Sequence, residues 1–216
     1  MKFPIARDSW PYLLGLAVLS VILYLIWPWI ALIPAILFLF ILYFFRNPER
    51  TIPGDETMLV SPADGVVMDI ERVFEDRFLN GESIRIRIFL SLFNVHMNRV
   101  PMSGTVVYRD YRPGQMLPAF KSHASEVNEK NFVGIENQNL RILVTQVTGF
   151  VARRIVCWVK TGDQVVRGER FGLIKFGSCT ELFVPPYVEV AVKPGEKVVG
   201  GVTVMGLVKV NERTGA

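Results

Sequence analysis

Hydrophobic and polar positions divide this chain into two unlike parts. No charged residue occurs from Ser9 to Phe45, whereas charged and apolar residues are interspersed from Arg46 onward. The uncharged segment is longer than one upright membrane span of about 20 residues and slightly shorter than two. Pro28 and Pro34 lie near its middle, where proline would interrupt a helix. The pattern therefore predicts a membrane hairpin of two helices.

We expect the two helices near Tyr12–Trp27 and Pro34–Phe45. Basic residues flank both ends of the segment: Lys2, Arg7, Arg46 and Arg50. Lysine and arginine concentrate on the cytoplasmic side of membranes, so this symmetry places both ends, and the domain that follows, on the cytoplasmic side of the cell membrane. The alternative is a single tilted span, with the main domain on the side opposite to the N-terminus. A cleaved secretory signal does not fit, because the segment is too long and ends in bulky residues.

After a linker at residues 46–55, the pattern changes to short runs that are typical of strands. The clearest alternation, Ser83–Ile88, predicts isoleucines that face a core and arginines that face outward. The expected strand regions are Gly65–Ile70, Ser83–Leu90, Thr105–Tyr108, Leu140–Gln146 and Arg154–Val159. No long helical periodicity separates them. We therefore expect a mainly β domain at residues 46–216, after a membrane segment at residues 1–45.

One internal repeat indicates pseudo-symmetry. The segment Val159–Gly168 is similar to Val192–Gly201, at an offset of 33 residues. Each copy is interpreted as a strand, a turn with a glycine before an acidic residue, and a second strand. This pattern resembles the hairpins of biotinyl/lipoyl-carrier domains, which display a lysine at a hairpin tip. Between the two copies the chain carries Phe176–Thr180 in place of that lysine, so a Gly-Ser pair lies between two β halves.

Composition and charge narrow the classes of function. A net charge of +4 fits a surface that rests on anionic lipid, and equally an ordinary soluble protein. No basic run is interleaved with aromatic residues, so nucleic acid is not an expected partner. Cys157 and Cys179 make neither a disulfide framework nor a CxxC metal pair. Free thiols in a reducing compartment, and no metal site, are therefore expected.

Three short segments contain candidate chemistry, around Asp64, His96 and Ser178. Taken singly, each has an ordinary structural explanation: a Pro-Ala-Asp-Gly turn, a buried histidine and a Gly-Ser turn. Taken together, Asp, His and Ser are the set that makes a serine hydroxyl nucleophilic. These residues alone leave open a membrane-anchored serine hydrolase or a non-enzymatic carrier-like adaptor. The mass of the purified chain, and a test for covalent biotin or lipoate, would separate the alternatives.

Five segments, in this order, resemble the phosphatidylserine decarboxylase family, and its short bacterial and archaeal branch in particular. They are Ser61–Gly65, Asn94–Met97, Tyr111–Gly114, Ser125–Asn131 and Phe176–Ser178. The resemblance covers residues 47–207. It implies a proenzyme that cuts itself between Gly177 and Ser178. The products would be a β chain of residues 1–177 and an α chain of residues 178–216, which stay associated.

The resemblance also implies the roles of the site residues. Ser178 would attack the carbonyl of Gly177, and β-elimination of the resulting ester would turn residue 178 into a covalent pyruvoyl group, the expected cofactor. His96 would take the serine proton, and Asp64 would orient His96. The pyruvoyl ketone would accept the electrons that remain when phosphatidylserine loses carbon dioxide, as pyridoxal phosphate does elsewhere. The expected partners are phosphatidylserine and membrane lipid, and a homo-oligomer is left open.

Four further positions carry expectations. Phe93 lies three residues before His96, where many relatives have a second histidine that is assigned to decarboxylation, so His96 or a water would supply that proton. Cys179 is expected to be an inert small residue, with substrate contact as the alternative. His123 is expected on the surface. Arg50, like Arg46, is expected to meet anionic lipid phosphates.

Overall fold

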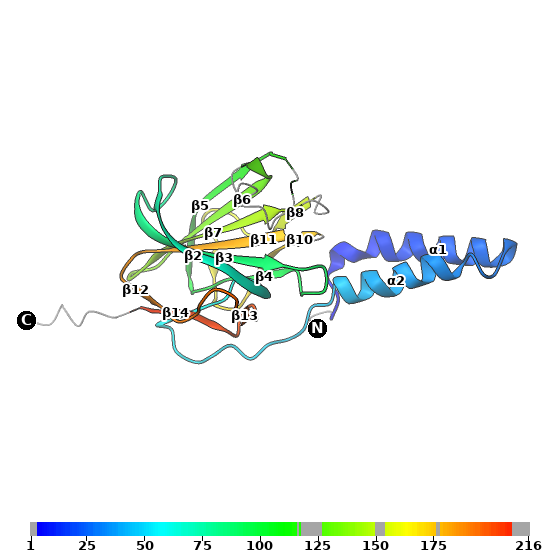
Figure 1. The fold of residues 1–216 in the computed structure, drawn as a ribbon, viewed down its shortest axis with the longest axis horizontal. Coiled ribbons are helices and arrows are strands. Elements are labelled where there is room, and N and C mark those ends of the chain that lie inside the picture. The colour runs from blue at the N-terminus through cyan, green and yellow to red at the C-terminus, as the bar shows by residue number, and fades with distance from the viewer. Residues whose placement is uncertain (1–3, 116, 118–126, 150–153, 176–177, 209–216) are drawn as a thin grey trace, which may run out of the picture. The chain divides into compact units, whose positions relative to one another are not determined.

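The structure is a computed structural model that describes residues 4–115, 117, 127–149, 154–175 and 178–208. The chain divides into two compact units, Met1–Glu49 and Arg50–Ala216. The first unit contains the helices and the second contains the strands (Figure 1). The sequence pattern placed the corresponding boundary after residue 45.

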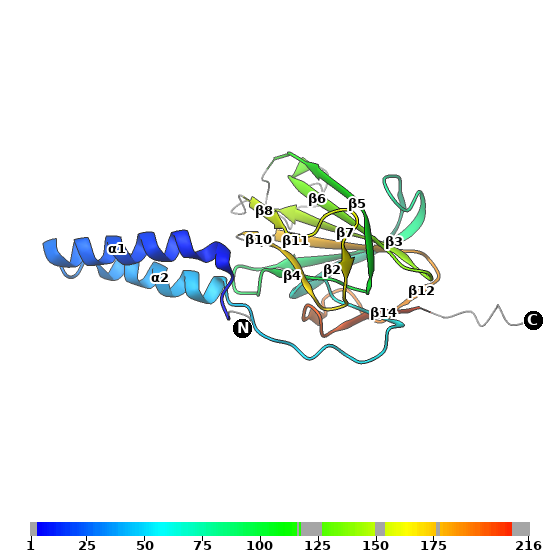
Figure 2. The same cartoon turned by 180° about the vertical axis from the view of Figure 1, so that it is seen from behind.

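The first unit is a pair of apolar helices that lie side by side (Figures 1 and 2). A 3-10 turn, η1 (Arg7–Ser9), leads into α1 (Trp10–Ile26), and α2 (Leu32–Phe44) follows. Pro34 lies in the first turn of α2, where a missing backbone N–H leaves no helical hydrogen bond unmade. The helix therefore begins at Leu32, two residues earlier than predicted. The predicted helical hairpin is present.

Backbone contacts join the two ends of this hairpin. The Ala6 N–H donates to the Phe45 carbonyl at 2.9 Å, and the Asn47 N–H donates to the Pro4 carbonyl at 2.6 Å. Large apolar side chains cover the outside of both helices, with Leu25 at 79% exposure. The segment Arg7–Ile26 is long and apolar enough to cross a membrane, and α2 is a shorter apolar helix.

The second unit is built from antiparallel strands. The largest sheet has eight strands in the order β13-β2-β3-β11-β7-β6-β5-β9, and two three-stranded sheets have the orders β1-β14-β12 and β4-β10-β8. The strands are β1 (Met58–Val60), β2 (Gly65–Glu75), β3 (Gly81–Leu90), β4 (Met97–Arg99), β5 (Gly104–Arg112), β6 (Lys130–Glu136), β7 (Arg141–Thr148), β8 (Arg154–Cys157), β9 (Gln164–Val165), β10 (Arg170–Lys175), β11 (Ser178–Val184), β12 (Val188–Val190), β13 (Lys197–Val198) and β14 (Val204–Val208). The mainly β prediction is confirmed, and β2, β3, β5, β7 and β8 coincide with the five predicted regions.

The internal repeat corresponds to a pseudo-symmetric arrangement. Gly162 and Gly195, at the same place in the two copies, have positive φ angles of 97° and 86°, which glycine adopts without strain. Strand β9 of the first copy pairs with β5, and β13 of the second pairs with β2, at the two edges of the large sheet. Each copy thus adds a two-residue strand to an edge of the sheet, rather than the two strands that the pattern suggested.

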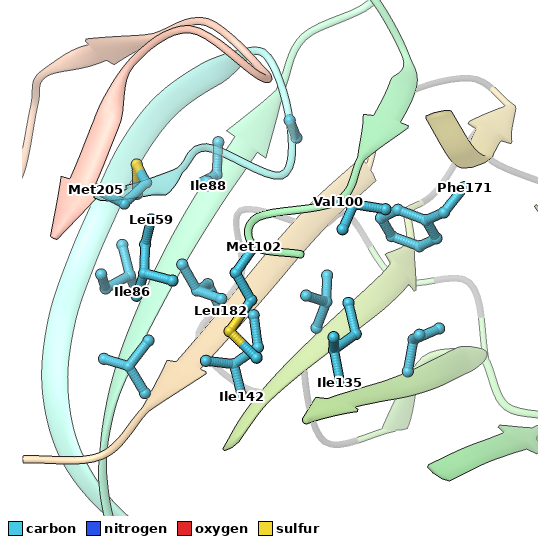
Figure 3. Close-up of a cluster of buried hydrophobic side chains, with 14 of the residues drawn as sticks. Leu59, Ile86, Ile88, Val100, Met102, Ile135, Ile142, Phe171, Leu182 and Met205 are labelled. Carbon is cyan, nitrogen blue, oxygen red and sulfur yellow. The ribbon is translucent and has the colours of Figure 1, made fainter. Parts of the chain in front are cut away.

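The main core lies on the concave side of the large sheet (Figure 3). Ile86 and Ile88 of β3 are 1% and 0% exposed there, as the alternation predicted. The prediction of outward, solvent-facing arginines is wrong for Arg87, which is buried and pairs with Asp69. A second apolar cluster packs on the opposite face of the sheet, the face on which Arg87 lies. It consists of Phe78, Phe132, Leu143 and Phe183. Burial on both faces explains why the central strands contain buried polar residues.

Candidate active site

Ser178 is the first residue of β11, a strand in the interior of the large sheet. It pairs with Leu90 at the end of β3 and with Thr148 at the end of β7. Its side chain is fully buried, and its hydroxyl has no hydrogen-bond partner among the residues that the structure describes. Most buried polar groups are paired, so an unpaired hydroxyl in this position is a candidate for a reactive group. Gly177, the other half of the predicted cleavage site, lies outside the described residues.

His96 lies directly before β4, and its backbone carbonyl accepts a hydrogen bond from the Ile174 N–H at 3.3 Å. Strand β10 therefore runs beside His96 and ends three residues before Ser178. The imidazole is buried, and its Nδ1 lies 3.0 Å from the Asn94 carbonyl oxygen. A carbonyl can only accept, so Nδ1 carries the proton in this hydrogen bond. In the neutral ring, Nε2 is then the basic nitrogen.

Asp64 lies in the loop between β1 and β2, and Arg50 holds its carboxylate. The Arg50 Nη1 and Nη2 atoms donate to Oδ1 and Oδ2 at 2.7 Å and 2.8 Å. The Gly200 N–H also donates to Oδ1, at 2.8 Å. Bidentate pairs of this kind fix geometry as well as adding energy. Within the described part of the chain, no hydrogen bond joins Asp64 directly to His96.

This pairing corrects one expectation. The Arg50 side chain is only 9% exposed, and it also donates to the Gly200 carbonyl at 2.9 Å. A guanidinium that is buried in this way is not available to lipid phosphates, so the predicted role of Arg50 at the membrane surface is wrong. The sequence carries no local signal for the pair, because its partners are 14 residues apart and no periodicity relates them.

The three candidate segments meet at one end of the large sheet. Val66, next to Gly65, pairs with Phe89, so the start of β2 lies beside the end of β3, where Ser178 also pairs. The loop of Asp64 contacts β4, the strand that directly follows His96, because the Pro62 carbonyl accepts from the Arg99 N–H at 2.9 Å. The structure thus brings together segments that are distant in sequence.

The remaining predicted positions are placed as follows. Cys179 follows Ser178 in an extended strand, so its side chain points to the opposite face. It is 1% exposed, and this burial raises the pKa of the thiol well above its ordinary value. This favours the inert interpretation. Phe93 is 67% exposed in the turn before His96, and His123 lies outside the described residues.

A hollow of about 480 Å³ is found elsewhere in the second unit. It is lined in part by Asn137–Leu140, which precede β7, whereas Ser178 pairs with the last residue of β7. The hollow therefore lies at the other end of the sheet from Ser178, and none of the three candidate residues lines it. A search for hollows alone would therefore not have found the candidate residues.

Comparisons with known proteins agree on one family. A family model described as phosphatidylserine decarboxylase matches residues 37–206. A protein of Carboxydothermus hydrogenoformans named phosphatidylserine decarboxylase proenzyme is 53% identical over 212 residues, which is 97% of this chain and 100% of that protein. Proteins with the same name are similar to the chain in Symbiobacterium thermophilum, at 47% identity over 95% of this chain and 97% of theirs, and in Geotalea uraniireducens, at 44% identity over 94% and 96%.

Proposed function

The chain belongs to the phosphatidylserine decarboxylase family and is a decarboxylase, and on this basis we propose that it matures by cutting itself between Gly177 and Ser178. The matured enzyme converts phosphatidylserine into phosphatidylethanolamine and carbon dioxide. The observation that carries the proposal is the buried hydroxyl of Ser178, which has no hydrogen-bond partner among the described residues and lies at the end of the sheet where the segments of Asp64 and His96 converge. The name proenzyme, which the relatives carry, is consistent with a processed chain.

The first step is an acyl shift. The Ser178 Oγ attacks the carbonyl carbon of Gly177, and the Nε2 atom of His96 takes the hydroxyl proton. The bond between the Gly177 carbon and the backbone nitrogen of residue 178 breaks, and that nitrogen receives the proton. An ester then joins Gly177 to the serine oxygen. A positioned general base of this kind contributes about 10²- to 10⁴-fold in rate.

The second step is an elimination. A base removes the α proton of residue 178, and Gly177 leaves as a free carboxylate at the new end of the β chain. The resulting double bond shifts to the nitrogen, and water replaces that nitrogen, which departs as ammonia. A ketone remains at the first residue of the α chain. Atoms balance with one water consumed and one ammonia released.

The surroundings of residue 178 suit a covalent group of this kind. The position is enclosed, and pairing of β11 with β3 and β7 keeps the new N-terminus in place after the backbone is cut. The pyruvoyl ketone supplies an electron acceptor for the carbon from which carbon dioxide departs. His96 is the histidine that the described residues place at this end of the sheet, and we assign to it the return of a proton to that carbon.

Asp64 acts on His96 in this scheme. It orients the imidazole and stabilises its cation, as the carboxylate of a serine triad does. The support is indirect: the loop of Asp64 is hydrogen-bonded to β4, the strand that directly follows His96, through the Pro62 carbonyl, and Arg50 fixes the carboxylate. The helical hairpin of the first unit anchors the enzyme in the cell membrane, with the β unit on the cytoplasmic side, where its lipid substrate is available.

The proposal is tested by replacing each of the three residues and following both cleavage and release of carbon dioxide from phosphatidylserine labelled in its carboxyl group. Ser178→Ala should remain one chain and release none. Either His96→Ala or Asp64→Ala should slow cleavage by orders of magnitude, as removal of a triad member does. Normal cleavage of Ser178→Ala at the same bond would show that this serine is not the nucleophile.

A further inference from the structure

One buried amide contacts all three candidate segments. The Asn98 Nδ2 atom donates to the Thr180 Oγ1 atom at 3.0 Å and to the Pro62 carbonyl at 3.4 Å. Its Oδ1 atom accepts from the Gln146 Nε2 atom at 2.9 Å. The side chains of Asn98, Thr180 and Gln146 are all fully buried. These contacts therefore replace water completely, and each is made in a low-dielectric interior.

Each contact lies two residues from a candidate catalytic residue. Asn98 follows His96 by two residues, Thr180 follows Ser178 by two, and Pro62 precedes Asp64 by two. Residues two apart in a strand point to the same face, so the Thr180 hydroxyl and the Ser178 hydroxyl share the core side of β11. Asn98 thus lies close to His96 in the chain and is hydrogen-bonded to the strand of Ser178 and to the loop of Asp64.

The hydrogen bonds of Gln146 fix the orientation of the Asn98 amide. The Gln146 Nε2 atom donates to the Val156 carbonyl at 3.4 Å, and its Oε1 atom accepts from the Asn131 Nδ2 atom at 2.9 Å. A carbonyl can only accept, so Gln146 presents its nitrogen on this side, where Asn98 also lies. That nitrogen requires the Asn98 oxygen, which leaves the Asn98 nitrogen for Thr180 and Pro62. If the Asn98 amide were flipped, its nitrogen would face the Gln146 nitrogen and its oxygen would face the Pro62 carbonyl oxygen. This series of hydrogen bonds, from β6 through β7 to β4, therefore holds the Asn98 amide rigidly in one orientation.

We propose that Asn98 is a positioning residue for the self-cleavage, an inference that rests on the proposed function. It holds the start of β11 against the segments of His96 and Asp64, so that the Ser178 oxygen keeps its place beside the base and the acid. A displacement of about 1 Å from a productive geometry can cost about 100-fold in rate. After the cut, the bond from Asn98 to Thr180 joins the β chain to the α chain, two residues from the new N-terminus.

The most selective test removes the hydroxyl of Thr180 rather than Asn98 itself. Thr180→Val keeps the shape of the side chain and deletes one hydrogen bond, whereas Thr180→Ser keeps the hydroxyl. Thr145→Val is a matched control, because Thr145 is also fully buried in the large sheet, on the neighbouring strand β7, and its hydroxyl has no hydrogen-bond partner within the described part of the chain. The full chain is synthesised in a cell-free system with lipid nanodiscs, and cleavage is followed after a labelling pulse.

Thr180→Val should slow first-order cleavage by about 100-fold, whereas Thr180→Ser and Thr145→Val should cut at rates close to that of the wild type. Asn98→Ala should be at least as slow, and adding Thr180→Val to it should slow cleavage no further, because both changes remove the same bond. Thermal unfolding of each variant is compared in the uncut Ser178→Ala background, where loss of general stability is seen apart from cleavage.

Two outcomes would overturn the inference: wild-type cleavage by Thr180→Val, or slowing that Thr145→Val reproduces with an equal fall in melting temperature. Slow cleavage by Thr180→Val, with rescue by serine, supports it. A wild-type chain that never cuts would refute the proposed function itself, which distinguishes that failure from a failure of the role assigned to Asn98.

Discussion

At the scale of single residues, the pair of Arg50 and Asp64 makes the most direct prediction. Removing the guanidinium would leave a carboxylate that is only 13% exposed without its charged partner. Arg50→Met should therefore lower the free energy of unfolding by about 3 kcal/mol, the lower end of the range for buried pairs. Arg50→Lys should recover part of this, because lysine cannot reproduce the bidentate geometry.

The control for this prediction is a second ion pair. Arg85 pairs with Glu71, whose side chain is 49% exposed, and exposed pairs contribute about 0–1 kcal/mol. Chemical denaturation in the uncut Ser178→Ala background measures both variants. Equal losses for Arg50→Met and Arg85→Met would contradict the role given to Arg50. Cleavage in the otherwise wild-type chain should also slow for Arg50→Met alone, because Asp64 loses its fixed position.

Cys179 offers a test of the site from its other face. Burial raises the pKa of this thiol, and the thiolate is the form that reacts with alkylating reagents. At pH 8 the native protein should therefore resist alkylation at Cys179, while the unfolded protein is labelled readily. Peptide mass mapping after a timed iodoacetamide pulse provides the measurement. Rapid labelling of the native chain would mean that Cys179 is open to the site.

Some of the candidate site residues could be identified from the sequence, and others could not. Asp64, His96 and Ser178 could be named because each lies in a recognisable segment. Arg50 and Asn98 could not be assigned, because no local pattern relates them to their partners. Arg50 pairs with Asp64 between two segments outside the strands, and the partners of Asn98 are distant in sequence. Asn98 bonds Thr180 across 82 residues, and no local pattern encodes such a contact.

At the scale of elements, short apolar runs predicted β2, β3, β5, β7 and β8, including β7, which is buried on both faces. They did not predict β11, which is buried along its whole length but carries Ser178, Thr180 and Glu181 among its apolar residues. The repeat predicted pseudo-symmetry correctly, but not that its short strands would pair with β2 and β5 at the sheet edges. Pairing partners are set by the whole sheet, which a local pattern does not contain.

The hairpin makes a prediction about topology. Helix α2 has 13 residues and is about 20 Å long at 1.5 Å per residue, which is shorter than a hydrocarbon core of about 30 Å. We therefore expect the two helices to enter the membrane together, with both ends on the cytoplasmic side. In a chain with Cys157→Ser and Cys179→Ser, single cysteines at Arg7→Cys and Thr51→Cys should both resist an impermeant maleimide in intact cells and react in inside-out vesicles.

Trp29→Cys, at the exposed tip between the helices, is the companion position and should react slowly from either side while it is in lipid. Labelling of Arg7→Cys and Thr51→Cys from opposite sides would contradict the hairpin topology and favour a single span.

At the scale of the whole molecule, the chain divides between residues 49 and 50, and we propose that the first unit attaches the enzyme to the membrane while the second carries the chemistry. The candidate residues lie in the second unit, so deletion of residues 1–45 should leave a chain that folds and cuts itself. It should lose much of its activity on phosphatidylserine in vesicles and retain more on short-chain substrate in detergent. Equal activity of truncated and full-length enzyme on vesicles would show that the hairpin does not bring enzyme and lipid together.

The intact mass of the purified, denatured protein tests the central claim most directly. The uncut chain has a mass of 24.5 kDa. Two chains should be found in its place: residues 1–177 with a free carboxylate at Gly177, and residues 178–216 at a mass lower by one ammonia than a peptide that begins with serine. A single 24.5 kDa species in a preparation that decarboxylates phosphatidylserine, or an α chain that begins with unmodified serine, would contradict the account.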